Sequence, residues 1–308
     1  IAAASGDLLA LARARGTGPA PGDPLLAGDA GPVPAGFSLL FSGADRGLCS
    51  VACFEGLGRA PDAGSTALAM RLDRVLAPTE GMAQHFRTLW PDAPAQVAKI
   101  PFPLVAQWPS ATDPGSLRQR QRDKLGLPDR ARLVLGIGPV GPDGGLERFA
   151  ALATRTCERR NDVRFVWLGG RDPDWERAHW LAVGLPVALR QLFLVDDEHL
   201  AAWLGAADAY IGCRPPAVYD PGAVEALGAG LPVCVASLAS LPEALWEPSC
   251  IGLLAERRDA AALDWLEARL AGQAAPRGAD DACRRRVLAR FGGKAAREAF
   301  RAALRASG

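Results

Sequence analysis

Short apolar runs of strand length alternate with segments of helical periodicity over the second part of the chain. In the segments between the runs, as in 146–160 and 198–208, apolar residues recur on one face at the spacing of an α-helix. The runs themselves cover residues 132–138, 163–170, 192–197, 209–216 and 232–237. This alternation predicts a parallel sheet wrapped by helices, in the order of one Rossmann-like domain.

The first part of the chain follows a less regular pattern. Residues 17–36 are rich in Gly, Pro, Ala and Asp, which predicts an irregular segment. Periodicity returns with a strand at 37–43, a helix through 48–57, a strand at 74–78 and a helix at 80–90. These elements predict a second, smaller α/β unit.

A polar stretch separates the two parts. Residues 107–130 carry few apolar positions and are expected to form a linker. The predicted organisation is a reduced N-terminal domain over 1–106, this linker, a Rossmann-like domain over 131–281 and a final helix over 282–308. A chain of 308 residues is long enough for two domains.

Composition and charge narrow the classes of function. Hydrophobic residues make up 49% of the chain and charged residues 22%, which is typical of a globular protein. The 35 basic and 34 acidic residues are scattered, so no nucleic-acid partner is expected. Because the sequence shows neither a run of ~18 apolar residues nor a signal pattern, we expect a cytoplasmic protein without a membrane span. A peripheral association with a membrane stays open.

Cysteines and histidines give no sign of a metal site. The seven cysteines form no Cys-x-x-Cys pair and lie mostly in apolar segments, so we expect buried free thiols in a reducing compartment. The three histidines lie in separate helical patterns, without the spaced partners that zinc requires. No metal and no separate cofactor are therefore predicted.

A candidate binding site lies in residues 217–237. An Asp-Pro-Gly turn at 220–222 precedes an expected helix over 222–229, and Glu225 would lie in the first turn of that helix. Free amides at a helix start favour a phosphate, and a carboxylate there can accept hydrogen bonds from the vicinal hydroxyls of a ribose. Alternatively, Glu225 only supports the start of its helix.

The order of segments around this stretch is more specific than any one of them. From about Arg74 to Leu304 the chain resembles the family 4 glycosyltransferases, and the similar segments are 73–105, 133–153, 163–170, 192–211, 224–245 and 252–263. The resemblance implies an α/β, GT-B-like fold with two Rossmann-like domains that face each other across a cleft. It also implies that the last helix crosses back to the first domain.

The resemblance implies a nucleotide-activated sugar as donor, held mainly by the C-terminal domain. The family's ribose-binding glutamate corresponds to Glu225, which opens the sequence "EALGAG". The backbone amides of Gly222, Ala223 and Val224 would face the diphosphate. Their dipoles would stabilise the charge of the leaving group, and no metal is needed for this.

Four further residues complete the expected donor site. By the same resemblance, Val195 and Asp196 would border the base at the end of their strand. Gly138 ends the first strand of the domain, and Arg171 follows the second strand. Both are candidates for contact with the donor.

Several positions depart from the family pattern. The family has two glutamates separated by seven residues across the turn, whereas here only Asp220 precedes Glu225, and Asp220 is the candidate substitute that would contact the transferred sugar. Pro139 and Gly144 stand where the family has an arginine and a lysine for the diphosphate. The replacement charge could come from three arginines, namely Arg148, Arg171 and Arg214.

The acceptor side is also reduced. We find no clear glycine loop and no clear acid or histidine near the sugar in residues 1–106. Glu55 is the candidate catalytic carboxylate of this half, because some family members place a glutamate after an aromatic residue at a comparable position. The alternative is that Glu55 is an exposed residue at a helix end.

Three functions remain open from the sequence. The first is a glycosyltransferase that moves a sugar from a nucleotide diphosphate to an unknown hydroxyl of a glycan, lipid or small molecule, with retention implied by the resemblance. The second is a catalytically silent relative that binds a partner enzyme or a glycan, which Pro139 and Gly144 favour. The third is another GT-B enzyme, such as an epimerase or a phosphorylase.

Overall fold

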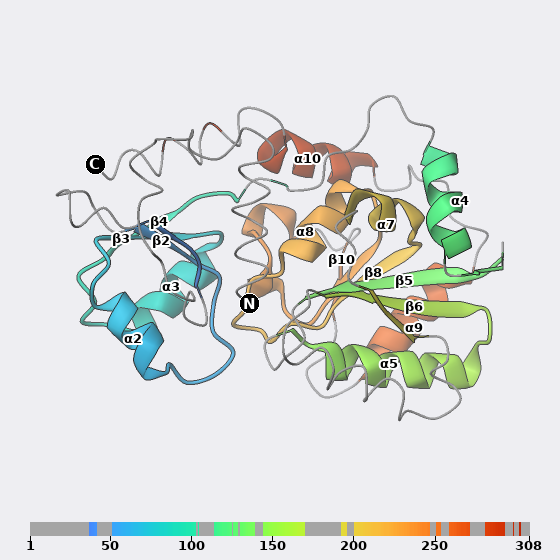
Figure 1. Ribbon diagram of the computed structural model, residues 1–308, viewed down its shortest axis with the longest axis horizontal. Helices are drawn as coiled ribbons and strands as arrows, with labels where there is room; N and C mark the ends of the chain where they lie inside the picture. Colours follow the sequence, from blue (N-terminus) through green and yellow to red (C-terminus); the bar gives the residue numbers. More distant parts are fainter. Residues whose placement is uncertain are drawn as a thin grey trace.

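The protein folds into two α/β units that lie side by side (Figure 1). The computed structural model describes residues 37–41, 51–102, 104, 114–124, 126–128, 130–138, 144–169, 192–195, 200–246, 251–253, 259–271, 281–292, 298 and 302.

The larger unit is built on a six-stranded parallel sheet. Its strands are β5 (Arg132–Ile137), β6 (Val163–Leu168), β7 (Leu192–Val195), β8 (Ala209–Gly212), β9 (Val233–Val235) and β10 (Ile251–Leu253). They are arranged in the order β10-β9-β8-β5-β6-β7, and all neighbours are parallel. This is the Rossmann order, so the prediction from the apolar runs is confirmed.

Helices cover both faces of this sheet. The helices and short 3₁₀ turns are α5 (Leu146–Arg159), α7 (Leu200–Ala206), α8 (Pro221–Gly228), η4 (Leu238–Ser240), η5 (Glu243–Leu245), α9 (Asp259–Leu270) and α10 (Asp281–Phe291). Successive residues of β5 point to opposite faces: Val134 packs with α5 and α9, whereas Leu133 and Leu135 belong to the core shared with α7, α8 and α10. Figure 1 shows these two helical layers on either side of the sheet.

The smaller unit contains a four-stranded sheet in the order β1-β2-β3-β4. Its elements are β1 (Phe37–Phe41), β2 (Val51–Phe54), α2 (Ala63–Ala69), β3 (Arg74–Ala77), α3 (Glu80–Leu89) and β4 (Gln96–Lys99). β1 runs antiparallel to β2, and the other neighbours are parallel. The core beneath α3 is aromatic and is made of Phe37, Phe54, Phe86 and Trp90.

The helix predicted through residues 48–57 is wrong, because this segment contains strand β2. All four residues of β2 are buried, so the strand has no polar face that would reveal its period of two. The sequence analysis also did not predict α2, which is capped by the side chain of Asp62.

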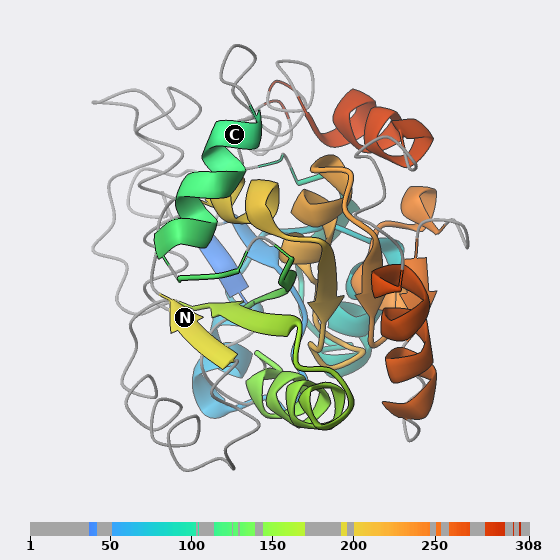
Figure 2. The ribbon, with the colours of Figure 1, turned by 90° about the vertical axis from the view of Figure 1, so that its right-hand side faces the viewer.

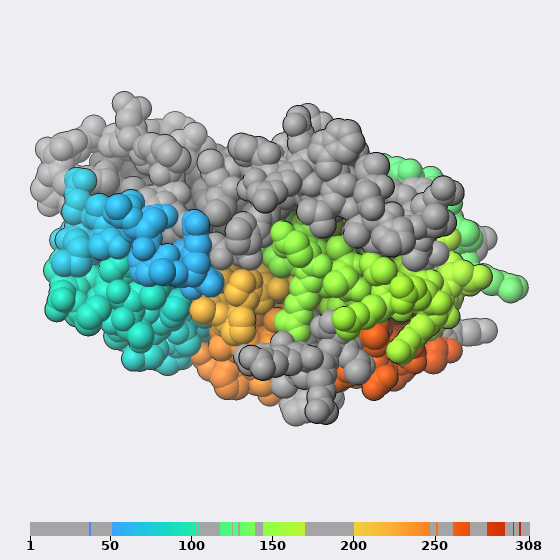
Figure 3. All heavy atoms as spheres, turned by 90° about the horizontal axis from the view of Figure 1, so that it is seen from below, coloured from blue at the N-terminus to red at the C-terminus, as the bar shows by residue number. Residues whose placement is uncertain are grey.

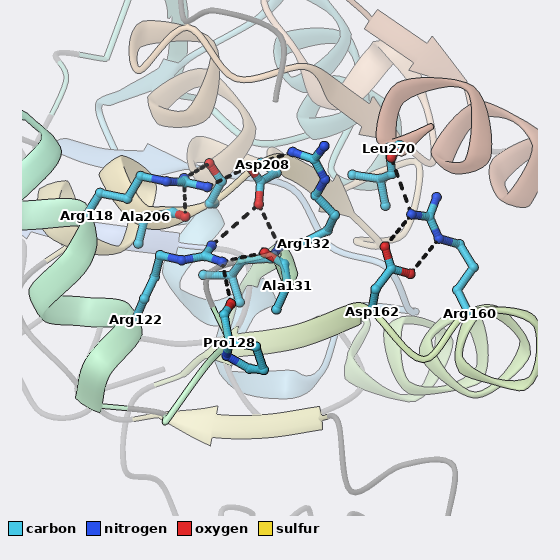
Figure 4. Close-up of polar contacts among 12 residues, drawn as sticks. Arg118, Arg122, Pro128, Ala131, Arg132, Arg160, Asp162, Ala206, Asp208 and Leu270 are labelled. Carbon is cyan, nitrogen blue, oxygen red and sulfur yellow. Dashed lines mark hydrogen bonds and ion pairs between the residues drawn. The ribbon is translucent and has the colours of Figure 1, made fainter. Parts of the chain in front are cut away.

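The predicted linker contains a helix, α4 (Pro114–Lys124), which packs on α7. Figure 2 shows the two helices beside each other. Arg118 and Arg122 of α4 reach toward Asp208, which lies between α7 and β8 (Figure 4). The polar stretch is therefore attached to the Rossmann-like unit through charged side chains. The predicted domain boundaries stay predictions.

The two units meet through the segment that follows β8. Tyr219 donates its backbone N–H to the carbonyl oxygen of Glu55 at 2.6 Å, and Gly56 forms an antiparallel bridge with Val218. Near η5, the Glu243 carboxylate accepts the N–H of Glu80 at 2.8 Å. Figure 3 shows the first unit, blue to cyan, in contact with the orange surface of the second.

The last described helix also lies near this junction. α10 packs against α8, and the carbonyl oxygen of Phe291 accepts the N–H of Leu104 at 2.9 Å. Among the helices of the described residues, none has both the length and the apolar character that a bilayer span requires.

Candidate functional site

The candidate site lies where the strand order of the larger sheet reverses. β5 and β8 are neighbours, yet the chain continues from β5 into α5 on one face and from β8 into α8 on the other face. The two connections diverge at the carboxyl edge, and this is the place where doubly wound sheets bind their ligands. We call this place the switch point, formed by Gly138, residues 144–146 and residues 213–222.

Glycines let the two connections approach each other closely. Gly145, the N-cap of α5, has φ +85°, and a β-carbon on it would overlap the carbonyl oxygen of Cys213. At the start of α8, a β-carbon on Gly222 would lie 3.0 Å from Cβ of Ile137. Gly138 follows β5 directly, and its carbonyl oxygen accepts the indole N–H of Trp167 at 3.1 Å. The predicted residues Gly138 and Gly222 are thus at the switch point.

Asp220 is the N-cap of α8 and is almost fully enclosed, with 1% of its surface exposed. Its Oδ1 accepts the N–H of Ala223 at 3.0 Å and the hydroxyl of Tyr210 at 2.8 Å. Its Oδ2 lies against Gly212 and has no hydrogen-bond partner among the described residues. Burial raises the pKa of this carboxyl above its usual value, and the positive charge of Arg214 opposes the shift.

The Asp220→Asn variant is expected to change how stability depends on pH. Because the folded-state pKa of Asp220 is raised, the folded protein binds its proton more tightly than the unfolded chain does. The free energy of unfolding therefore decreases through this group as pH rises from 3.8 to the raised value, and then levels off.

Urea unfolding of both proteins between about pH 3.5 and 8 measures this difference, because all other groups titrate alike in the two proteins. The stability of wild type relative to Asp220→Asn should fall with rising pH. A stability difference that stays constant with pH, or that shifts in favour of the wild type as pH rises, would contradict the raised pKa of Asp220.

Glu225 lies in the second turn of α8 and not in the first turn, so that part of the sequence prediction is wrong. The helix begins at Pro221, one residue earlier than expected, because proline presets the backbone at the first helical position and Asp220 caps it. Only 4% of Glu225 is exposed, and its neighbours Val224 and Ala226 belong to the core. A buried carboxylate at this depth requires partners of its own.

Three predicted carboxylates converge on Tyr219. This side chain is buried and packs edge to face on Phe102, with ring centroids 5.8 Å apart. Burial raises its pKa well above the usual value, and the negative charges of Glu55, Glu225 and Asp220 raise it further. The charge of Glu55, from the first unit, and the charges of two carboxylates of the second unit thus act on the same tyrosine.

Sequence reasoning did not identify Tyr219 or Tyr210. The chain has only two tyrosines, and both lie within ten residues of Asp220. That concentration was the available signal, but spacing alone cannot show which side chains meet across two units.

The remaining predicted site residues are Glu55, Val195, Asp196 and Arg171. Glu55 is half-buried and follows β2, so it is not at a helix end as the alternative assumed. The backbone of Val195 ends β7, which lies two strands from β5 at the sheet edge. Asp196 and Arg171 lie outside the described residues.

Comparisons with solved structures first give the fold. The sucrose-phosphate synthase of Thermosynechococcus elongatus superposes with a TM-score of 0.61 at 20% identity, over 83% of this chain and 67% of that chain. HepE of Anabaena in complex with UDP and glucose gives a TM-score of 0.58 at 14% identity, over 78% of this chain and 65% of that chain. The protein has the α/β fold of the GT-B glycosyltransferases.

The sequence comparison then adds a relative with a glycosyltransferase name. D-inositol 3-phosphate glycosyltransferase of Streptomyces coelicolor is 27% identical over 202 residues, which are 59% of this chain and 44% of the relative. The chain thus matches less than half the length of that relative. No protein-family model matches the chain. Fold and sequence together confirm the resemblance to the family 4 glycosyltransferases.

Proposed function

We propose that this protein is a glycosyltransferase that takes a sugar from a nucleoside diphosphate bound at the switch point. The observation that carries the proposal is the buried carboxylate of Glu225 on α8, beside the switch point of a GT-B fold. Because HepE, a protein of the same fold, is described in complex with UDP, uracil is the first base to test.

The donor would be held by groups from both connections. Glu225 accepts hydrogen bonds from the ribose hydroxyls, and the first turn of α8, from Gly222 to Val224, directs its positive end at the diphosphate. The N–H of Ala223 is engaged by Asp220, so Ala223 contributes through the position of the turn. Val195, Asp196, Gly138 and Arg171 remain the candidate contacts to the base and the rest of the donor.

The chemistry is substitution at the anomeric carbon. The bond from this carbon to the diphosphate oxygen breaks, and a bond to an acceptor hydroxyl oxygen forms, while the hydroxyl proton passes to a base or to the leaving group. Charge builds up on the diphosphate, where the helix dipole lowers its energy without a metal. Glu55 and Asp220 are the candidates for the transferred sugar, with retention of configuration and an acceptor that stays open.

A silent relative is the second candidate, because Gly144 and Pro139 supply no positive charge where the family has two cations. Such a protein would bind the nucleotide diphosphate or a partner without transfer. Turnover separates the two functions: release of UDP from UDP-glucose with an acceptor supports the enzyme, whereas tight binding without any release supports the silent relative.

Titration calorimetry with UDP, GDP and ADP tests the donor site. We expect micromolar binding of one nucleotide, weakened at least tenfold by Glu225→Gln, which is about 1.4 kcal/mol. Glu158→Gln, at the far end of α5 and exposed, is the matched control and should bind like the wild type. Absence of binding to all three nucleotides, or an unchanged affinity in Glu225→Gln, would overturn the proposal.

A further inference from the structure

Arg214 follows β8 by two residues, at the switch point, and is half-buried. Its Nε is buried and has no hydrogen-bond partner among the described residues. An enclosed guanidinium N–H without an acceptor is unfavourable, because the group has lost its hydrogen bonds to water and forms none with the protein. Arg214 therefore has an unused donor at the place where a ligand is expected.

The charge of Arg214 acts on the interior of the site. It opposes the rise in pKa that burial causes at three side chains, namely Tyr210, Tyr219 and Asp220. No ion pair joins Arg214 to Asp220 in the described part of the chain, although Oδ2 of Asp220 also lacks a hydrogen-bond partner. The guanidinium thus lies near Asp220 without being neutralised by direct contact.

The surroundings of Arg214 suit an anion. Cys213, the residue before it, packs directly on Gly145 at the start of α5. The N-cap residue of this helix is a glycine, so no side chain of the N-cap accepts a hydrogen bond from the first amides of the helix. A guanidinium and a helix N-terminus on adjacent connections favour the same ligand, a phosphate group.

The charge of the other candidate cation of the described residues acts at another place. Arg148 lies in the first turn of α5, and its charge lowers the pKa of the Cys234 thiol, which burial raises to about 12. Cys234 packs in the core between the sheet and the α5–α9 layer, away from α8. The charge of Arg148 therefore acts on the core beneath α5, whereas the charge of Arg214 acts on Tyr210, Tyr219 and Asp220.

We propose that Arg214 binds the diphosphate of the donor and supplies the positive charge that Pro139 and Gly144 do not. This inference rests on the proposed function of the same site. The planar guanidinium presents Nε and a terminal nitrogen as a fork that matches two phosphate oxygens. When the sugar is transferred, the same fork holds the charge of the leaving diphosphate.

The test compares ligands with and without phosphates. UDP, uridine and inorganic pyrophosphate are titrated against wild type, Arg214→Gln, Arg214→Lys and the control Arg159→Gln, which changes an exposed arginine at the far end of α5. We expect Arg214→Gln to weaken the binding of UDP and of pyrophosphate at least tenfold and to leave the affinity for uridine unchanged. Arg214→Lys should recover part of the affinity for UDP and for pyrophosphate, and Arg159→Gln should match the wild type.

The outcomes separate this inference from the proposed function. The role of Arg214 is overturned, and the donor site stands, if wild type binds UDP and Arg214→Gln binds it with the same affinity. The same conclusion follows if Arg214→Gln reduces the affinity for uridine as much as the affinity for UDP. If wild type binds pyrophosphate through Arg214 but no nucleotide, the donor site is overturned, and Arg214 is a phosphate-binding residue without a role toward a donor. Binding of neither ligand overturns both.

Discussion

Replacement of Asp208 by alanine is expected to lower the free energy of unfolding by about 3–5 kcal/mol, the range for removing one partner of a buried ion pair. Asp208 is paired with Arg118 at 2.7 Å, Arg122 at 3.7 Å and Arg132 at 3.8 Å (Figure 4). Its Oδ2 also accepts the N–H of Leu133 at 2.8 Å. The side chain of Arg122 is only 3% exposed, so it would keep a buried charge after the change.

Asp162→Ala is the matched control for this prediction. Asp162 also pairs with an arginine, Arg160, at 2.6 Å, but its side chain is 40% exposed. A pair in contact with water is worth about 0–1 kcal/mol. Urea unfolding of the two variants should give clearly different losses, and equal losses would show that the Asp208 cluster does not hold α4 and α7 together.

Gly145→Ala is expected to destabilise the protein by about 2–5 kcal/mol. Alanine pays roughly 1–2 kcal/mol for the left-handed backbone that Gly145 adopts at φ +85°. Its methyl group would also collide with the carbonyl of Cys213, and overpacking of this kind adds about 1–3 kcal/mol. Because the collision separates the two connections of the switch point, affinity for UDP should fall as well.

Gly126→Ala is the control for the collision, because it carries the cost of the left-handed backbone alone. Gly126 has φ +59°, and a β-carbon on it would meet no atom within 4 Å. This variant should lose only the roughly 1–2 kcal/mol of the left-handed backbone and should bind UDP like the wild type. A loss at Gly145 no larger than the loss at Gly126, measured by urea unfolding, would contradict the close approach of the two connections.

The parallel sheet of the larger unit could be predicted because its strands are buried on both faces and read as apolar runs. Helix α4 could not be predicted in the same way, since it attaches through Arg118 and Arg122 and has no apolar face that repeats at helical spacing. Strand β2 shows the related difficulty: four apolar residues fit a strand and a buried helical segment equally well.

The candidate site was predicted only as far as local sequence determines it. Asp220, Pro221 and Gly222 form a cap and a helix start whose chemistry is local, so the place of the site could be derived. The approach of Glu55 to Tyr219 depends on contact between two units, and no spacing in the sequence contains it. The unused Nε of Arg214 likewise follows from burial, which the sequence does not give.

The location of bound UDP in a crystal of this protein tests the central claim most directly. We predict density for the nucleotide at the switch point between β5 and β8, with the ribose at Glu225 and the diphosphate at Arg214. Density at another place, or none at saturating UDP, would contradict the account of this site.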